Sequence, residues 1–351
     1  MDSLKYQKFS QFDHADAFFN SLKESYAEFS DWLVKKAKAD ESAYVLYDEA
    51  NKIEGFLYLK IEDDVSDVQP PLPEGLHLKI GTFKFESKGT LRGQRFIKKV
   101  FDTAISERVD HIYVTVFEKH DYLIRLFQKY GFYKHGEKHT KNGTEFVYVR
   151  DLNNINGDVI LDYPFLINNK ENKYLLSIYP DFHTRLFPDS RLLTESPDIV
   201  QDVSHTNSIH KIYICAMKDV LRMRRGDIIV IYRTTDRPGQ ARFRSVISSL
   251  CVVEEIKTAH EFPTLKSYID YCGRFSVFSD AELKKIYKEG RYPYIIRFTY
   301  NVALPKRIIR DKLINEIGLN EGGYWGVMKL TNDQFNEIIR LSEVNEDFIV
   351  N

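Results

Sequence analysis

The stretch that decides the fold runs from residue 77 to residue 98 and reads HLKIGTFKFESKGTLRGQRFIK. Apolar and polar residues alternate over residues 75–85, which predicts a strand, and residues 93–106 are predicted to be helical. A turn of small residues joins the two. Backbone N–H groups at the start of such a helix, together with the positive end of its dipole, form a binding site for phosphate. Lys88 and Arg92 add positive charge to this turn.

The residues around this stretch indicate a sheet covered by helices. We expect helices at 1–40 and 121–130, a strand hairpin at 43–47 and 54–60, and a proline-rich acidic loop at 61–74. Strands are also predicted at 111–117 and 145–150. This order of elements is typical of an α/β (α+β) fold, with a mixed central sheet and flanking helices.

Two motifs resemble the GNAT superfamily of N-acetyltransferases over about residues 1–150. The first is Lys88-Gly89-Thr90-Leu91-Arg92-Gly93, and the second is Tyr130-Gly131-Phe132 at a helix end. The resemblance implies acetyl-CoA as the cofactor, its pyrophosphate held by backbone amides of the first motif. It also implies that a backbone N–H near Thr82 and Phe83 polarises the acetyl carbonyl. The cofactor-binding residues predicted in this way are Thr82, Phe83, Phe85, Lys88, Gly89, Thr90, Leu91, Arg92 and Gly93.

The chain departs from the family pattern at two positions. Leu91 stands where most members have glycine, and Phe127 stands where many have a tyrosine that protonates the leaving thiolate. A phenyl ring has no proton to donate, so another group or water does this work, or the activity is weak or lost.

The predicted catalytic residues are His77, His120 and Tyr122. His77 aligns with a catalytic glutamate of some family members, and a histidine suits a general base at neutral pH. Glu118, Glu86 and a water relay are alternatives for the base. His120 and Tyr122, at the start of the predicted helix 121–130, are candidates for the missing acid, with Tyr130 as a further possible donor.

Residues 151–159 are polar and rich in turn formers, so we expect a linker between a first domain at 1–150 and a second at 160–351. Short strands are predicted in the second domain at 174–179, 211–216, 227–232, 245–255 and 294–300, with helices at 264–271, 280–289 and 332–342. This pattern, with Gly226-Asp227 at a strand start, resembles the PUA-like group, which includes the ASCH and EVE families. The resemblance implies a partly open β-barrel with added helices that binds RNA or modified nucleobases.

The second domain contains a basic segment at residues 205–310, with 20 Lys and Arg against 10 Asp and Glu, in a chain whose net charge is −1. Such an excess favours a nucleic-acid partner, RNA rather than DNA, although a protein partner is also considered. Arginine binds phosphate in bidentate fashion, and tyrosine stacks on bases. The predicted nucleic-acid residues are Arg222, Arg224, Arg225, Tyr232, Arg233, Arg242 and Arg244.

The bulk properties of the 351-residue chain narrow its class. No signal-peptide pattern or membrane-length apolar run is seen, and the three cysteines are scattered, so a cytoplasmic protein with neither metal site nor membrane partner is expected. Two functions follow from these observations. One is acetylation of an amine on, or near, a recruited nucleic acid. The other is a catalytically weak CoA sensor or interaction module of a toxin–antitoxin or defence-type system.

Overall fold

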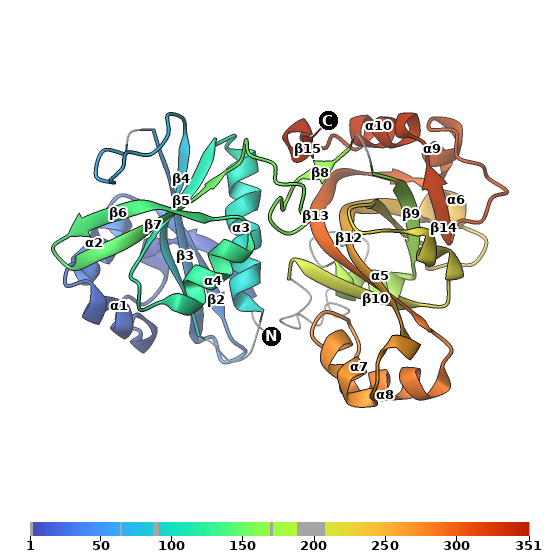
Figure 1. Cartoon of the computed structure of the whole chain (residues 1–351), viewed down its shortest axis with the longest axis horizontal. Coiled ribbons are helices and arrows are strands. Elements are labelled where there is room, and N and C mark those ends of the chain that lie inside the picture. The colour runs from blue at the N-terminus through green and yellow to red at the C-terminus, as the bar shows by residue number, and fades with distance from the viewer. Residues whose placement is uncertain (1–2, 64, 87–90, 169–170, 188–207, 351) are drawn as a thin grey trace. The chain divides into compact units, whose positions relative to one another are not determined.

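The computed structural model describes residues 3–63, 65–86, 91–168, 171–187 and 208–350. The chain forms two compact units, residues 1–156 and 157–351, each of mixed α/β structure (Figure 1). The mixed α/β class expected from the sequence is confirmed. The division between the units falls at Asn156 and Gly157, within the stretch where we expected the linker.

The first unit is built on a seven-stranded sheet with the order β1-β2-β3-β4-β5-β7-β6. Only β4 and β5 pair in parallel, and the other neighbours are antiparallel. The strands are β1 (Ser3–Lys8), β2 (Ser42–Tyr47), β3 (Ile53–Glu62), β4 (His77–Phe85), β5 (His111–Val116), β6 (Tyr133–Thr140) and β7 (Gly143–Asp151). The helices are α1 (Asn20–Ser25), α2 (Phe29–Lys38), α3 (Arg92–Ser106) and α4 (Asp121–Lys129).

Helices cover both faces of this sheet. Neighbouring residues of a strand point to opposite sides, so a strand with consecutive apolar residues has an apolar surface on each face. Phe56 packs with Phe9, Phe19 and the other apolar residues of the α2 side. Its neighbour Gly55 lies against Phe96 of α3, where an added Cβ would come within 2.8 Å of the phenylalanine ring. The sheet is therefore buried between α2 and α3.

Two edge strands were missed by the sequence prediction. Residues 1–40 were expected to be helical, but Ser3–Lys8 forms β1 and pairs antiparallel with β2. The polar strand β6 pairs with β7. Both lie at sheet edges, where side chains stay largely exposed and apolar alternation is not required. Their pairing is decided by the neighbouring strand rather than by their own composition.

The second unit contains a six-stranded sheet with the order β10-β13-β12-β11-β9-β14. Three irregularities interrupt the pairing of its long strands β12 and β13, and such bulges bend strands. The strands of the unit are β8 (Leu166–Ile167), β9 (Lys173–Ile178), β10 (His210–Cys215), β11 (Ile228–Arg233), β12 (Val246–Thr258), β13 (Tyr294–Ile309), β14 (Val327–Leu330) and β15 (Ile349–Val350). The helices are α5 (Pro180–Leu186), α6 (Ala241–Arg244), α7 (Leu265–Cys272), α8 (Asp280–Glu289), α9 (Arg310–Asn315) and α10 (Asn332–Leu341).

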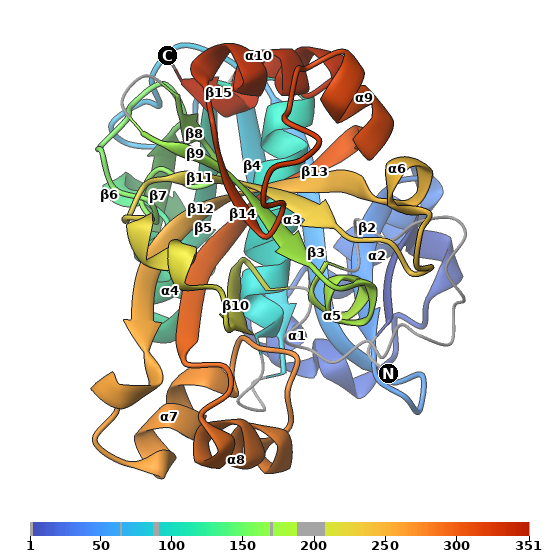
Figure 2. The ribbon, with the colours of Figure 1, turned by 90° about the vertical axis from the view of Figure 1, so that its right-hand side faces the viewer.

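Separate apolar clusters occupy the two faces of this sheet. One joins Val230 and Ile247 to Leu313 of α9 and Phe335 of α10. The other gathers strand residues such as Phe298 around Phe187 at the end of α5. Figure 2 shows α9 and α10 at one end of the sheet and α7 and α8 at the other. The strands thus form a packed core rather than an open channel.

Candidate active site in the first unit

The parallel strands β4 and β5 separate partway along their length. Their pairing runs from His77 and His111 to Ile80 and Val114 and ends there, although β4 continues to Phe85. The pairing of β3 with β4 skips Gly81, so a bulge lies directly after the last paired residue. A Cβ on Gly81 would come within 2.7 Å of the Tyr58 ring, which explains the glycine. The bulge and the missing pairing leave β4 backbone groups facing an opening.

A cavity of about 760 Å³ occupies this opening, within the range that binds small molecules and cofactors. Consecutive β4 residues line it. Of these, Phe83 packs towards α3 and α4, and Thr82 points to the opposite face. The cavity is therefore bordered by side chains from both faces of the sheet. Its wall is formed by Ser21, Leu22, Glu24, Ser25, Tyr26, Glu28, Phe29, Trp32, Ile80, Gly81, Thr82, Phe83, Lys84, Phe85, Val114, Thr115, Val116, Lys119, His120, Tyr122, Leu123, Phe127 and Glu145.

Five of the predicted site residues lie at this cavity. Thr82, Phe83 and Phe85 line it from β4, and His120 and Tyr122 line it from the start of α4. His120 is the residue that precedes the first turn of α4. Partial burial and the neighbouring Lys119 lower the pKa of His120, so its imidazole is neutral at pH 7. Tyr122 is 59% exposed, and its ring lies near that of Phe85.

Phe127 also lines the cavity, and the structure makes clear that it acts as packing. Its ring is fully buried, with its centroid 5.1 Å from that of Phe83 and 5.2 Å from that of Phe132. No proton can come from this position. The residues with exchangeable protons that line the cavity at the start of α4 are Lys119, His120 and Tyr122.

A second titratable pair, which the sequence prediction missed, lies in the wall formed by α1, α2 and β7. The Tyr26 hydroxyl donates a 2.6 Å hydrogen bond to Glu145, whose side chain is 4% exposed. Burial and this carboxylate raise the pKa of Tyr26, so the phenol stays protonated. The Tyr26 ring also lies beside Phe117, 5.4 Å between centroids. The two residues are 119 positions apart, so no local sequence pattern could have joined them.

The structure places His77 away from the cavity. This residue begins β4, whereas the cavity begins at Ile80, about 10 Å further along the strand at roughly 3.3 Å per residue. Its side chain is 3% exposed and packs beside His111 and Tyr113. Burial and His111 lower the pKa of His77, so it is a neutral core residue. Glu86 and Glu118 do not line the cavity either.

The predicted phosphate turn is only partly described. Lys88, Gly89 and Thr90 lie outside the described residues. Leu91 and Arg92 are buried and do not line the cavity. Arg92 does not offer the free positive charge that was predicted, because its guanidinium forms a 2.8 Å ion pair with the buried Glu54.

Gly93 occupies a closely packed position. An added Cβ would come within 2.8 Å of the Leu126 side chain and 3.0 Å of the Phe85 ring. The start of α3 therefore fits closely against both α4 and β4, which holds this side of the opening together.

The predicted nucleic-acid residues of the second unit are not gathered into one site. Arg222, Arg224 and Arg225 are exposed near the end of the short 3-10 helix Lys218–Arg222, whereas Arg242 and Arg244 lie on α6. Most of these charges meet a carboxylate of the same unit. The pairs are Arg222 with Asp219, Arg225 with Asp158, Arg242 with Asp311 and Glu321, and Arg244 with Asp236. Arg224 has no such partner among the described residues.

Tyr232 and Arg233 lie in the interior of the second unit rather than on its surface. Tyr232 is 2% exposed and its ring packs on Trp325, so the ring cannot stack on a base. Arg233 is 4% exposed. Both belong to β11, a central strand in which consecutive residues face two apolar clusters. A basic or aromatic residue in such a strand is buried whichever face it occupies.

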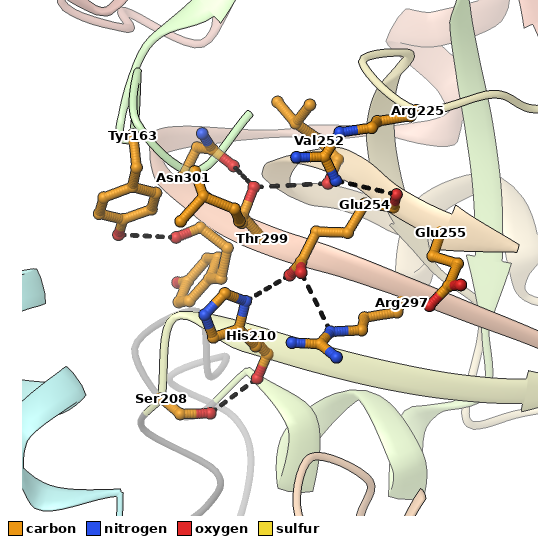
Figure 3. Close-up of polar contacts among 12 residues, drawn as sticks. Tyr163, Ser208, His210, Arg225, Val252, Glu254, Glu255, Arg297, Thr299 and Asn301 are labelled. Atoms are coloured by element: carbon orange, nitrogen blue, oxygen red, sulfur yellow. Dashed lines mark hydrogen bonds and ion pairs between the residues drawn. The ribbon is translucent and has the colours of Figure 1, made fainter. Parts of the chain in front are cut away.

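The second unit also contains a buried polar network (Figure 3). His210 bonds to Glu254 through its Nδ1, and the Nε of Arg297 lies 3.0 Å from the other oxygen of this carboxylate. Asn301 accepts a 2.8 Å hydrogen bond from Thr299 and donates one to the carbonyl of Pro164. Each carboxylate oxygen of Glu254 already has a cationic or imidazole partner. The network therefore stabilises the packing of β10, β12 and β13 against one another.

The described residues form no group of three or more His, Cys, Asp or Glu side chains arranged to hold a metal. Within the same ranges, every helix is too short or too polar to cross a membrane.

No protein-family model matches the chain, and no curated protein sequence matches it. Solved structures do resemble it. NAA60 of Arabidopsis thaliana in complex with acetyl-CoA shares 15% identity with a TM-score of 0.32, over 44% of this chain and all of the other. The IAA acetyltransferase of Bacillus cereus shares 11% with a TM-score of 0.32, over 43% and 100%.

A mutant of ZmASCH from Zymomonas mobilis shares 15% identity with a TM-score of 0.32, over 48% of this chain and 95% of that one. Each of these structures therefore corresponds to less than half of the chain. The residues at the cavity, rather than these similarities, have to decide its chemistry.

Proposed function

We propose that the first unit transfers an acetyl group from acetyl-CoA to an amine. The observation that carries this proposal is the separation of β4 from β5 directly after Ile80 and Val114, with a cavity bordered by both faces of the sheet. A thioester carbonyl needs hydrogen-bond donors where negative charge develops, and an amine must approach it from another direction. Where β4 and β5 separate, free backbone N–H groups can donate to the carbonyl, and the amine can approach from the other face of the sheet.

The residues present fit this cofactor on the side of α4. The β4 segment from Thr82 to Phe85 offers backbone groups to the acetyl and pantetheine portions, and Phe83 and Phe127 give that side an apolar wall. Acetyl-CoA would supply an acetyl thioester there. The phenol of Tyr122, and the imidazole of His120 once it has taken a proton from the attacking nitrogen, are the groups positioned to protonate a leaving thiolate.

The test is direct binding and turnover with the full chain. Titration calorimetry with acetyl-CoA should give a saturable signal, and free thiol should appear when a primary amine is added. Gly81→Ala should weaken acetyl-CoA binding at least tenfold, because a Cβ there pushes against Tyr58 and alters the bulge. Gly322→Ala is the matched control, since its Cβ meets only Asn320 at 3.7 Å. Absence of acetyl-CoA binding by the unmodified chain would overturn the proposal.

We further propose that the second unit brings the enzyme to a nucleic acid, RNA rather than DNA, that carries or accompanies the acceptor. The basic excess of residues 205–310 and the exposed Arg224 support this. Replacing Arg224, which has no carboxylate partner among the described residues, by Gln should weaken RNA binding and reduce its salt dependence. The Arg242→Gln and Arg244→Gln pair is the control, because those charges are matched by Asp311 and Asp236. Equal effects of both variants would count against a localised RNA site.

A second candidate function follows from Phe127. An opening that binds acetyl-CoA but lacks a strong acid is suited to sensing CoA within a toxin–antitoxin or defence-type assembly. Thiol release distinguishes the two functions. If acetyl-CoA binds and no amine or RNA yields turnover above the uncatalysed rate, the sensor is favoured.

A further inference from the structure

The cavity has two chemically different walls. On the α4 side stand His120, Tyr122 and the apolar pair Phe83 and Phe127. On the other side, α1, α2 and β7 contribute three carboxylates, Glu24, Glu28 and Glu145, together with Tyr26 and Trp32. Lys119 reaches from the loop before α4 to the hydroxyl of Ser25, so the two walls are joined at one place.

Glu145 stands apart from the other two carboxylates. Glu24 is exposed, and Glu28 is engaged by Asn142 and Lys141 near the protein surface. Glu145 is buried, yet among the described residues the partner of its side chain is the neutral phenol of Tyr26. A buried carboxylate is normally paired with a positive charge, so its neutral partner and position at the cavity point to a cationic ligand.

The strand register places Glu145 on the correct face for such a ligand. Val147 pairs with Thr115 of β5, and Glu145 lies two residues before Val147. Side chains two residues apart on a strand share a face, so Glu145 and Thr115 project to the same side of the sheet, next to the opening between β4 and β5. The β4 bulge lies across this opening.

From this geometry we infer that Glu145 is the residue that binds the acceptor ammonium and removes its proton, and that Tyr26 is a positioning residue that holds the carboxylate. The inference rests on the proposed acetyl transfer and assigns its acceptor class, an alkylamine that is protonated when free. It names α1, α2 and β7 as the acceptor wall and α4 as the cofactor wall.

The reaction balances with these roles. The carboxylate of Glu145 takes one proton from the ammonium and passes it to solvent. The freed nitrogen pair forms the new C–N bond at the acetyl carbonyl carbon. The C–S bond then breaks, and the departing thiolate receives the second proton lost by the nitrogen, through His120, Tyr122 or water. One ammonium and one thioester thus yield one amide, one thiol and one proton.

A comparison of two nucleophiles tests this role. A lysine-type ammonium has a pKa near 10.4 and needs a base at neutral pH, whereas hydroxylamine is already a free base. Glu145→Gln keeps the size of the side chain and an acceptor oxygen for Tyr26. The Glu145→Gln variant should lower kcat/KM for butylamine at least 100-fold, and this loss should become smaller as the pH rises. For hydroxylamine the same variant should lower kcat/KM less than tenfold. Tyr26→Phe should produce a smaller loss in the same direction.

Two further measurements keep the test decisive. The affinity of Glu145→Gln for acetyl-CoA, measured by calorimetry, should stay within twofold of the unmodified chain. Glu137→Gln, on the neighbouring strand β6 and away from the cavity, is the matched control and should leave both rates unchanged. An equal loss with both nucleophiles, or none, would overturn the role of Glu145. Failure of the unmodified chain to acetylate any amine would instead overturn the proposed transfer itself.

Discussion

Glu145 in the first unit and Glu254 in the second are both buried carboxylates on strands, yet they are in opposite situations. Glu254 is surrounded by His210 and Arg297, and the backbone carbonyl of the same residue accepts a bond from Arg225. Glu145 has a neutral phenol as its partner and borders a cavity. Burial alone therefore does not mark a functional group. What distinguishes Glu145 is that it is buried, has no cationic partner in the part of the chain that the structure describes, and lines a cavity that a ligand can fill.

The same contrast separates the predicted site residues within the first unit. Arg92 was predicted to meet phosphate but is paired with Glu54 in the interior. His120 and Tyr122 line the cavity. We therefore expect substitutions of residues paired in the interior to change stability, and substitutions of residues that line the cavity to change activity.

The largest stability effect is expected for Arg92→Met. Removing one partner of a deeply buried ion pair leaves the Glu54 carboxylate with less compensation, which typically costs about 3–5 kcal/mol. Urea unfolding of the full chain, followed by a signal from the first unit, measures this loss. The double variant with Glu54→Gln should recover part of the stability. Unchanged stability with weaker acetyl-CoA binding would instead restore Arg92 to the phosphate site.

The next effect tests the two carboxylates against each other. Glu254→Gln should destabilise the second unit by about 3 kcal/mol, because Arg297 and His210 lose their common acceptor charge. Glu145→Gln should change stability by less than about 1 kcal/mol, because the hydrogen bond from Tyr26 can persist. Thermal unfolding of both variants gives the comparison. Similar losses at the two positions would mean that Glu145 is structural.

A pH effect of intermediate size is expected at His183. This fully buried imidazole shares a 2.6 Å hydrogen bond with Ser248, and burial lowers its pKa to about 3. Between pH 6.5 and pH 3 the unfolded chain therefore binds a proton that the folded chain does not, so stability falls as the pH falls. The loss from this residue should reach about 2 kcal/mol at pH 5. His183→Gln should flatten the stability curve in this window, and an unchanged slope would contradict the assignment.

The smallest effect is expected for Gly93→Ala. The added Cβ contacts the end of the Leu126 side chain, which can shift, so strain is partly offset by the higher helix propensity of alanine. A net loss of about 1 kcal/mol is expected by chemical denaturation. A net gain would show that α3 and α4 are packed less tightly than the contact distances indicate.

Much of the fold could be predicted from local patterns. The helix beginning at Arg92, the buried strand beginning at His111 and the helix beginning at Asp121 all follow from apolar spacing and turn residues. These elements have buried faces, and a buried face requires apolar residues at a regular spacing along the sequence. Edge strands such as β1 and β6 have little burial, so they were missed.

The candidate site was predictable only where it coincides with a motif. His120 and Tyr122 were found because they open a helix that ends in Tyr130-Gly131-Phe132. His77 was misplaced because counting along a strand does not reveal where its pairing with β5 ends. The arginines of the second unit were overvalued because their carboxylate partners, such as Asp311 for Arg242, lie far away in sequence.

The sequence by itself determined the α/β class, the helix that starts after the glycine-containing turn and the basic character of residues 205–310. Each of these depends on residue type and spacing along the chain. The tertiary structure alone decided which polar groups are paired in the interior and which line the cavity. Tyr26, in the turn between α1 and α2, meets Glu145 only when that turn lies beside β7, and Arg92 meets Glu54 only when α3 packs on β3. Whether a charged side chain binds a ligand or stabilises the fold depends on such distant partners, because burial and neighbouring charges set the free energy of its charged form.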